Sequence, residues 1–277
     1  MAVLLALCSS AVYGAADFFG GLGAKRLPAL VVVSVSQLAG ALLVVLVVPV
    51  AGGVRTVHDL VLGACAGLLG ALALVLFYRA LAEGSMSVVA PVTAVCGAAV
   101  PVLAGLATGD VLGAPAIAGV VLALPAIGLA ASEGGLGALR HDLRGLTRPV
   151  LAGLGFGGVL LLLHGTSHDG GLWPLVASRL TAGVVVAGLL VARGTPLRVP
   201  RGSLTTVVAA GAADTLANVL FLLAVRMGQL SVVGLLSSLY PVSTVVLAAA
   251  VLRERLSKVQ LAGVGGCTVA VLLIASS

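Results

Sequence analysis

Four charged or amide side chains stand inside apolar stretches that are long enough to cross a membrane. Asp17 lies in VYGAADFFGG, Arg179 lies in WPLVASRLTAG, and Asp214 and Asn218 lie in a later apolar stretch. A charge at the centre of a membrane helix costs about 2.5–3.5 kcal/mol and usually faces a cavity or a partner. A buried carboxylate can bind a proton or a cationic group, and a guanidinium can hold a carboxylate through two hydrogen bonds. These residues are therefore our candidates for binding a solute or a coupling ion.

Each candidate also has a purely structural interpretation. Asp17 and Asp214 could form ion pairs or cap helices near the membrane interface, and Arg179 could pair with Asp214 or with another helix. Asp214 and Asn218 are four residues apart, so both face the same side of a helix. The sequence leaves the structural and the functional interpretations open.

Three tyrosines and one glutamine complete the candidate set. Tyr13, Tyr78 and Tyr240 lie in or at the end of apolar stretches of a chain that is only 3% aromatic. A tyrosine in a helix bundle usually needs a hydrogen-bond partner, so it suits a cavity wall as well as a core. We expect all three to line a cavity. Gln37 is included because it occupies about the place in the first half that Arg179 takes in the second.

The two halves of the chain share a sequence pattern. FYRALAEGSMSVV begins at position 77 and FLLAVRMGQLSVV begins at position 221, 144 positions later. The alignment without gaps matches polar and glycine positions as well as apolar ones, such as Gly84 with Gly228 and Ser87 with Ser231. Membrane proteins built from internal repeats usually place a substrate path between the repeats. The repeat therefore favours a transporter.

The composition places the chain in a membrane. It has 277 residues, of which 60% are hydrophobic and 9% charged, with a mean hydropathy of +1.25. An ordinary soluble domain carries about 25% charged residues. The net charge of +6 comes almost wholly from the connections between apolar stretches, so we expect no nucleic-acid partner. The first stretch has no basic segment before it, and we interpret it as a retained span and not as a signal peptide.

The apolar stretches predict an all-α integral membrane protein with about ten transmembrane helices. We place the helices at residues 2–23, 29–50, 60–81, 85–107, 112–132, 150–166, 173–192, 203–225, 230–251 and 259–276. This gives a first repeat of five helices over 1–132, a linker over 133–149 and a second repeat of five over 150–277. Because each repeat holds an odd number of spans, the second must enter the membrane from the opposite side, so the repeats are inverted.

The basic residues predict an orientation. Most of the lysines and arginines, among them Lys25, Arg26, Arg193 and Lys258, lie in odd-numbered connections. Basic connections usually stay in the cytoplasm, so this distribution places both termini outside.

Motifs for enzymatic chemistry are absent from the sequence. There is no P-loop, no GxSxG, no HExxH and no GxGxxG after a strand, so we expect neither an enzyme nor a cofactor. His164, His168 and Asp169 cluster in HGTSHDGG, where His164 and His168 could share a helix face and bind a metal ion, but without a third firm ligand we interpret this segment as a loop. The four cysteines are isolated in apolar stretches without metal-binding spacing. We therefore expect no metal site.

Several segments of the chain are similar to a known family. YGAADFFGGLGAKR, YRALAEGSMSVVAPVTA, SSLYP at 237–241 and LRERLSKVQLAGVG at 252–265 resemble the repeated pattern of EamA-type transporters in the drug/metabolite transporter superfamily. The resemblance covers the entire chain. Glu254 and Arg255 match the acidic-Arg pair of the family, whereas the first half has Asp110 followed by Val111.

The resemblance implies two inverted five-helix bundles around a central cavity, which opens alternately to the two sides. It also implies export or exchange of amino acids, other small metabolites or toxic compounds across a bacterial inner membrane. Members of the family commonly have both termini in the cytoplasm, which is opposite to what the loop charges predict.

We expect a multi-pass secondary transporter with a lipid bilayer, a small solute and a proton or another coupling ion as its partners. Whether the protein forms a homodimer stays open. The alternatives are a membrane-embedded enzyme or lipid-handling protein, and a passive channel or structural subunit.

Overall fold

The computed structural model describes residues 1–83, 86–109, 113–130, 143–252 and 257–275, which form helices and no strand. The helices are α1 (Ala2–Ala24), α2 (Ala29–Ala51), α3 (Val57–Glu83), α4 (Met86–Ala107), α5 (Ala114–Ala130), α6 (Leu143–His164), the 3₁₀ turn η2 (His168–Gly170), α7 (Trp173–Ala192), α8 (Arg201–Val225), α9 (Leu230–Ser237), α10 (Tyr240–Leu247), the π turn η3 (Ala248–Leu252) and α11 (Lys258–Ala275).

The predicted all-α membrane class is confirmed. Seven helical segments of the described residues are long and apolar enough to cross a membrane, and one of them, Leu230–Val251, runs through α9, α10 and η3. Each of the ten predicted ranges overlaps a helix of the structure. The number of ten spans and the boundaries of the two repeats stay predictions.

Two differences from the predicted helices have local causes. The linker expected over 133–149 is shorter, because α6 begins at Leu143 and carries its polar first turns beyond the apolar segment. The helix expected over 230–251 is divided after Ser237 into α9 and α10. Pro241 lacks the N–H that would continue the helical hydrogen bonds, which explains a break just before it.

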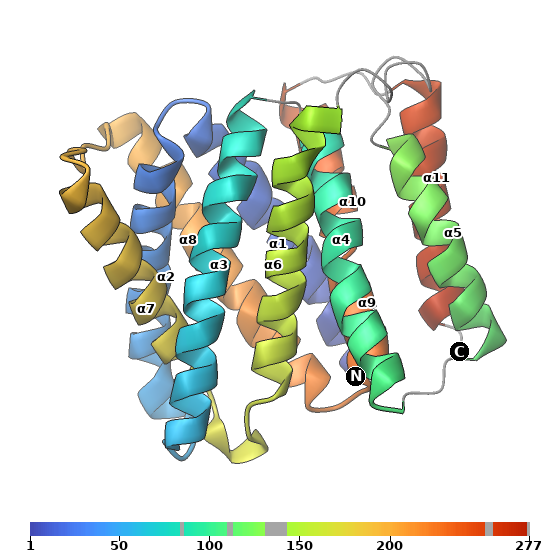
Figure 1. Cartoon of the computed structure of the whole chain (residues 1–277), viewed down its shortest axis with the longest axis horizontal. Coiled ribbons are helices and arrows are strands. Elements are labelled where there is room, and N and C mark those ends of the chain that lie inside the picture. The colour runs from blue at the N-terminus through green and yellow to red at the C-terminus, as the bar shows by residue number, and fades with distance from the viewer. Residues whose placement is uncertain (84–85, 110–112, 131–142, 253–256, 276–277) are drawn as a thin grey trace.

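Successive helices along the chain, with α9 and α10 taken as one, run alternately up and down between two ends of the bundle (Figure 1). We call the end with Met1, the α2–α3 connection and the α6–α7 connection the lower end. The α1–α2 and α7–α8 connections lie at the upper end, and α11 returns the chain to the lower end (Figure 1). The exposed basic residues Lys25, Arg26 and Arg193 lie in connections of the upper end.

The helices of one half pack mainly against those of the other. Contacts join α1 to α8, α3 to α6, α2 to α7 and α8, α3 to α7, α4 to α6 and α9, and α1 to α9 and α10. α5 and α11 form a pair at one side of the molecule (Figure 1). The counterparts in the two halves are α1 and α6, α2 and α7, α3 and α8, α4 and α9–α10, and α5 and α11. If each helix in this set of contacts is replaced by its counterpart, the same set of contacts results. An approximate two-fold axis between the halves produces this pattern.

Glycines let the helices of the two halves approach closely. Gly67 of α3 lies against the backbone of Ser178 in α7, and Gly211 of α8 lies against the backbone of Ser36 in α2. Gly67 and Gly211 are equivalent positions of the repeat, 144 apart. In lipid, where helices gain little from hydrophobic burial against each other, small residues at close contacts are a main source of packing energy.

Two apolar clusters lie toward the two ends of the bundle. The upper cluster contains Phe18 and Phe77, together with Leu81. The lower cluster contains Leu163 and Phe221, together with Leu175. Phe77 and Phe221 are equivalent positions of the repeat, and both are fully buried. α3 runs upward and α8 runs downward (Figure 1), so the same sequence position is used at opposite ends.

We predict that Gly211→Ala lowers the melting temperature of the detergent-solubilised protein by several degrees. A methyl group there would meet the carbonyl of Ser36, and such overpacking costs about 1–3 kcal/mol. The control is Gly188→Ala on the outer face of α7, where nothing lies within 4 Å. Alanine there should leave stability unchanged or raise it slightly, because glycine is the poorer helix former. Equal effects at the two positions would contradict the packing argument.

Candidate functional site

A cavity lies between the two halves of the chain. Counting the open space at its mouth, it offers about 760 Å³ free of protein atoms. The residues around it are Tyr13, Asp17, Gln37, Ala66, Gly67, Gly70, Leu74, Gly97, Phe156, Gly157, Val159, Leu160, Ser178, Arg179, Ala182, Asp214, Asn218, Ser237, Ser238 and Tyr240. Seven of our eight candidate residues are among them.

Arg179 is the centre of a polar network on one wall. Its Nη1 donates to Oε1 of Gln37 at 2.8 Å and forms an ion pair with Asp214. Asn218 Nδ2 donates to the carbonyl oxygen of Asp214 at 2.8 Å. Arg179 and Gln37 are buried, and the side chain of Asp214 is 20% exposed. The ion pair offered as the structural interpretation of Arg179 is therefore present, and it faces the cavity.

Asp17 differs from Asp214 in having no partner. Asp17 is only 8% exposed and lies on α1 at the cavity. Among the residues that the structure describes, no donor or cation lies within hydrogen-bonding distance of its carboxylate. The cavity thus holds two carboxylates and one guanidinium, of which Asp214 and Arg179 balance each other. Asp17 has no counter-charge of its own among the described residues, which is costly for a buried carboxylate.

Other polar atoms of the wall are buried without a partner in the described part of the chain. They are Nε of Arg179, Oγ of Ser237 and Oη of Tyr240. The ring of Tyr240 lies 6.3 Å from that of Tyr13, centroid to centroid. Buried polar atoms are rarely left unpaired, so these three atoms distinguish this wall from an ordinary packed core.

The opposite wall of the cavity is apolar. α3 contributes Gly70 and Leu74, and α6 contributes Phe156, Val159 and Leu160. The polar groups come instead from α1, α2, α7, α8 and the segment in which α9 ends and α10 begins. A solute in this cavity would meet hydrogen-bonding groups on one side and hydrocarbon on the other.

Tyr78, the eighth candidate, does not line the cavity. It lies one turn beyond Leu74 on α3 and packs in the upper cluster, where its ring fills the space opposite Gly20. It is 2% exposed. Tyr78 lies past the upper edge of the cavity, and the height at which the cavity ends depends on packing between helices that are distant in sequence.

HGTSHDGG forms the connection between α6 and α7, as expected for a loop. Searching the described residues for clusters of His, Cys, Asp and Glu finds no group of three that could hold a metal ion.

Sequence reasoning missed Asp59, whose side chain is fully buried in the first turn of α3 and accepts hydrogen bonds from Ser167. Thr56 accepts a hydrogen bond from the backbone N–H of Asp59 at 3.1 Å. The pattern Thr-x-x-Asp is typical of a helix start and could have indicated an earlier beginning of α3 than residue 60.

Comparisons with known proteins agree with this architecture. Residues 145–276 match the model of the EamA-like transporter family. No curated protein matches the sequence. A solved structure described only as "Crystal structure of protein" has a TM-score of 0.73 and 18% identity, covering 99% of this chain and 98% of its own. At that identity the likeness shows the fold alone.

The family match covers the second half of a chain whose helices have the length and apolarity of membrane spans. The chain is therefore a multi-pass membrane protein whose second half, over residues 145–276, is similar to EamA-like transporters.

Proposed function

We propose that this chain is a secondary transporter that moves a small solute across the membrane by alternating access. The observation that carries the proposal is a buried cavity between the halves, in which Asp17 has no cationic partner. Transporters with inverted repeats commonly bind their solute between the repeats and rock one against the other. The exchange symmetry of the helix contacts supports repeats over 1–132 and 150–277.

The proposed substrates are amino acids and related small metabolites, toxic compounds included, exported or exchanged across a bacterial inner membrane. Gln37, Arg179, Asp214 and Asn218 form a preorganised polar wall that orients the solute. Asp17 binds a proton in one half of the cycle and a cationic group of the solute, or another coupling ion, in the other. Tyr13 and Tyr240, whose rings lie beside each other, line the same part of the site.

The apolar clusters argue for a transporter over a passive channel. The upper cluster around Phe77 and the lower cluster around Phe221 lie on the two sides of the cavity. A polar solute would have to cross one of them to leave. Movement of the halves can open one cluster at a time, which is what alternating access requires.

We predict that a cysteine at Ser178 becomes accessible from both sides of the membrane. The four native cysteines, Cys8, Cys65, Cys96 and Cys267, are replaced by alanine, and Ser178→Cys is labelled with an impermeant maleimide in intact cells and in inside-out vesicles. Ser178 lines the cavity, so both faces should react. The control is Ala152→Cys, fully buried in α6 and away from the cavity, which should react slowly from either side. Labelling of Ser178→Cys from one face only would sink alternating access.

We predict that Asp17→Asn removes the preference of the site for cationic solutes. A panel of small primary amines, amino acids and uncharged alcohols at equal concentration is screened for thermal stabilisation of the detergent-solubilised protein, since a bound ligand raises apparent stability. Amines should stabilise the native protein more than their alcohol counterparts, and Asp17→Asn should abolish the difference. An unchanged preference in the variant would remove Asp17 from solute binding.

The Arg179–Asp214 pair should show strong coupling in a double-mutant cycle. Asp214→Asn alone leaves a buried guanidinium without its counter-charge, and breaking a fully buried pair costs about 3–5 kcal/mol. We expect less here, because the carboxylate is 20% exposed. Arg179→Met combined with Asp214→Asn should melt at a higher temperature than Asp214→Asn alone. Additive losses in thermal unfolding would show that the two side chains act independently.

A further inference from the structure

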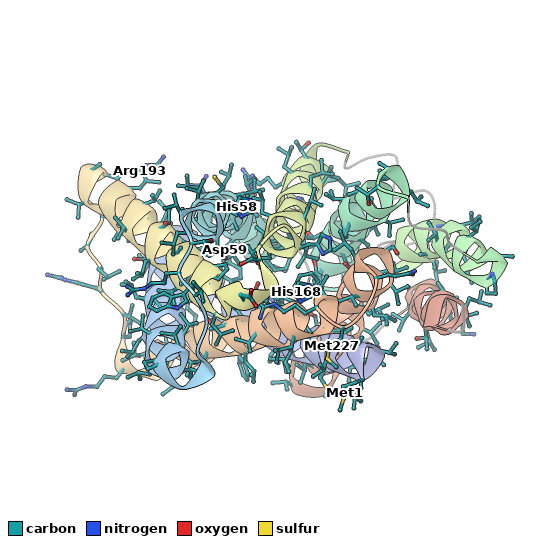
Figure 2. The ribbon with its side chains drawn as sticks, turned by 90° about the horizontal axis from the view of Figure 1, so that it is seen from below. Met1, His58, Asp59, His168, Arg193 and Met227 are labelled. Carbon is teal, nitrogen blue, oxygen red and sulfur yellow. The ribbon has the colours of Figure 1, made fainter. Side chains whose placement is uncertain are left out.

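Two connections from different halves of the chain are fastened together at the lower end. The buried carboxylate of Asp59, at the start of α3, accepts the backbone N–H of Ser167 at 2.8 Å and the hydroxyl of the same residue. Asp59 and Ser167 are separated by 108 residues of sequence. In the view from below, Asp59 lies beside His168 of the α6–α7 connection (Figure 2). A buried charge that accepts two hydrogen bonds is held much more firmly than an exposed one.

The backbones of the two connections are also in direct contact. Val54 N–H donates to the carbonyl oxygen of Asp169 at 2.7 Å. Gly53 and Gly171 approach so closely that a Cβ on either would meet the backbone of the other connection. Their φ angles are +113° and +55°, which side chains other than glycine rarely adopt. Close fit and unusual backbone angles occur together here, which argues for a specific contact.

Four further contacts extend the fastening to α7 and α8. Arg226, just after α8, donates to the carbonyl oxygens of Ser167 at 3.3 Å and Gly171 at 2.9 Å. Burial lowers the pKa of Arg226, and the nearby carboxylates of Asp59 and Asp169 oppose that shift. Trp173 donates its indole N–H to the carbonyl oxygen of Gly53 at 3.3 Å. The guanidinium of Arg55 lies 4.7 Å from the centre of the Trp173 ring.

We call this set, Asp59, Ser167, Trp173, Arg226 and the backbone of Gly53 and Gly171, the lower interlock. It ties together the lower ends of α3, α6, α7 and α8, which all contribute to the cavity wall. Along the chain, Asp59 lies seven residues from Ala66 of the cavity, Trp173 five from Ser178, and Arg226 eight from Asn218, which corresponds to roughly 7–12 Å along the helix axes. The lower apolar cluster occupies the space between. The interlock therefore lies across the lower side of the cavity.

The upper end has no such fastening among the residues described there. Connections 25–28 and 193–200 share no hydrogen bond or ion pair, and their own hydrogen bonds are local. Arg148 of α6 pairs with Glu83 of α3, but both side chains are largely exposed. Such surface pairs contribute little to stability. Among the described residues, the polar contacts that join connections of the two halves thus lie at the lower end.

We infer that the lower interlock is a gate that holds the cavity closed toward the lower end and that must be released before the solute leaves on that side. The inference rests on the proposed alternating access and specifies which face is fastened. Opening the lower end separates Ser167 and Gly171 from Asp59 and Arg226, so water must take over several hydrogen bonds at once. The state that is open at the upper end is accordingly the resting state.

The test uses the Ser178→Cys reporter in the cysteine-free chain, labelled by the impermeant maleimide from each face. Asp59→Asn and Ser167→Ala each weaken the interlock and should raise the labelling rate from the lower face about 10-fold, because lost charge-assisted hydrogen bonds shift the population toward the open state. The matched control is Glu83→Gln, which breaks the exposed pair with Arg148 between the same two helices. It should leave the lower-face rate unchanged.

A disulfide provides a second test that does not depend on how these variants fold. Val54→Cys with Asp169→Cys, added to the reporter chain, joins two residues already linked by a backbone hydrogen bond. Its oxidation should suppress lower-face labelling about 10-fold while the upper face still reacts, and reduction should restore it.

Unchanged lower-face rates in Asp59→Asn and Ser167→Ala, or lower-face labelling that persists across the disulfide, would overturn the gate. An equal rise in Glu83→Gln would show general loosening instead, and would overturn it too. If the reporter without these changes reacts from one face only, alternating access itself fails, which separates the two outcomes.

Discussion

One guanidinium connects the two halves of the protein at the wall of its cavity. Arg179 of α7 reaches Gln37 of α2 and Asp214 of α8. In a membrane interior a charge must find its partners within the protein, since lipid offers none. The position of these three helices is therefore fixed partly by electrostatics. The same contacts that hold the halves together form the polar wall of the site, so movement of the halves must change the site.

The positions that the two halves share build the helix packing, and the positions at which the halves differ make the two ends of the bundle unlike. Gly67 and Gly211 occupy equivalent close contacts, and Phe77 and Phe221 occupy equivalent apolar clusters at opposite ends. The lower interlock has no such counterpart. The position equivalent to Asp59 is Ser203, and the position equivalent to Arg226 is Ala82. The two halves are thus similar in arrangement, but the lower interlock fastens them to each other at the lower end of the bundle.

Much of the fold and most of the candidate site could be predicted because a membrane makes polar residues conspicuous. A charge or amide in a long apolar stretch has to face inward, and Asp17, Arg179 and Asp214 do so. Tyr78 did not follow, since a tyrosine is apolar enough to pack in a core. Asp59 escaped notice for another reason: it lies just before the expected start of a helix, and its partner Ser167 is distant in sequence.

The fastened end bears on the direction of transport. If the basic connections face the cytoplasm, as their charge predicts, the lower interlock lies on the outer side. The resting cavity then opens to the cytoplasm, and a solute loads from there before the interlock is released. Binding can favour release only through contacts that differ between the two states. The polar wall can provide such contacts, because α7 and α8 carry both Arg179 and Asp214 of the wall and the interlock residues at their lower ends. A solute that displaces these helices at the cavity therefore also changes their position at the interlock.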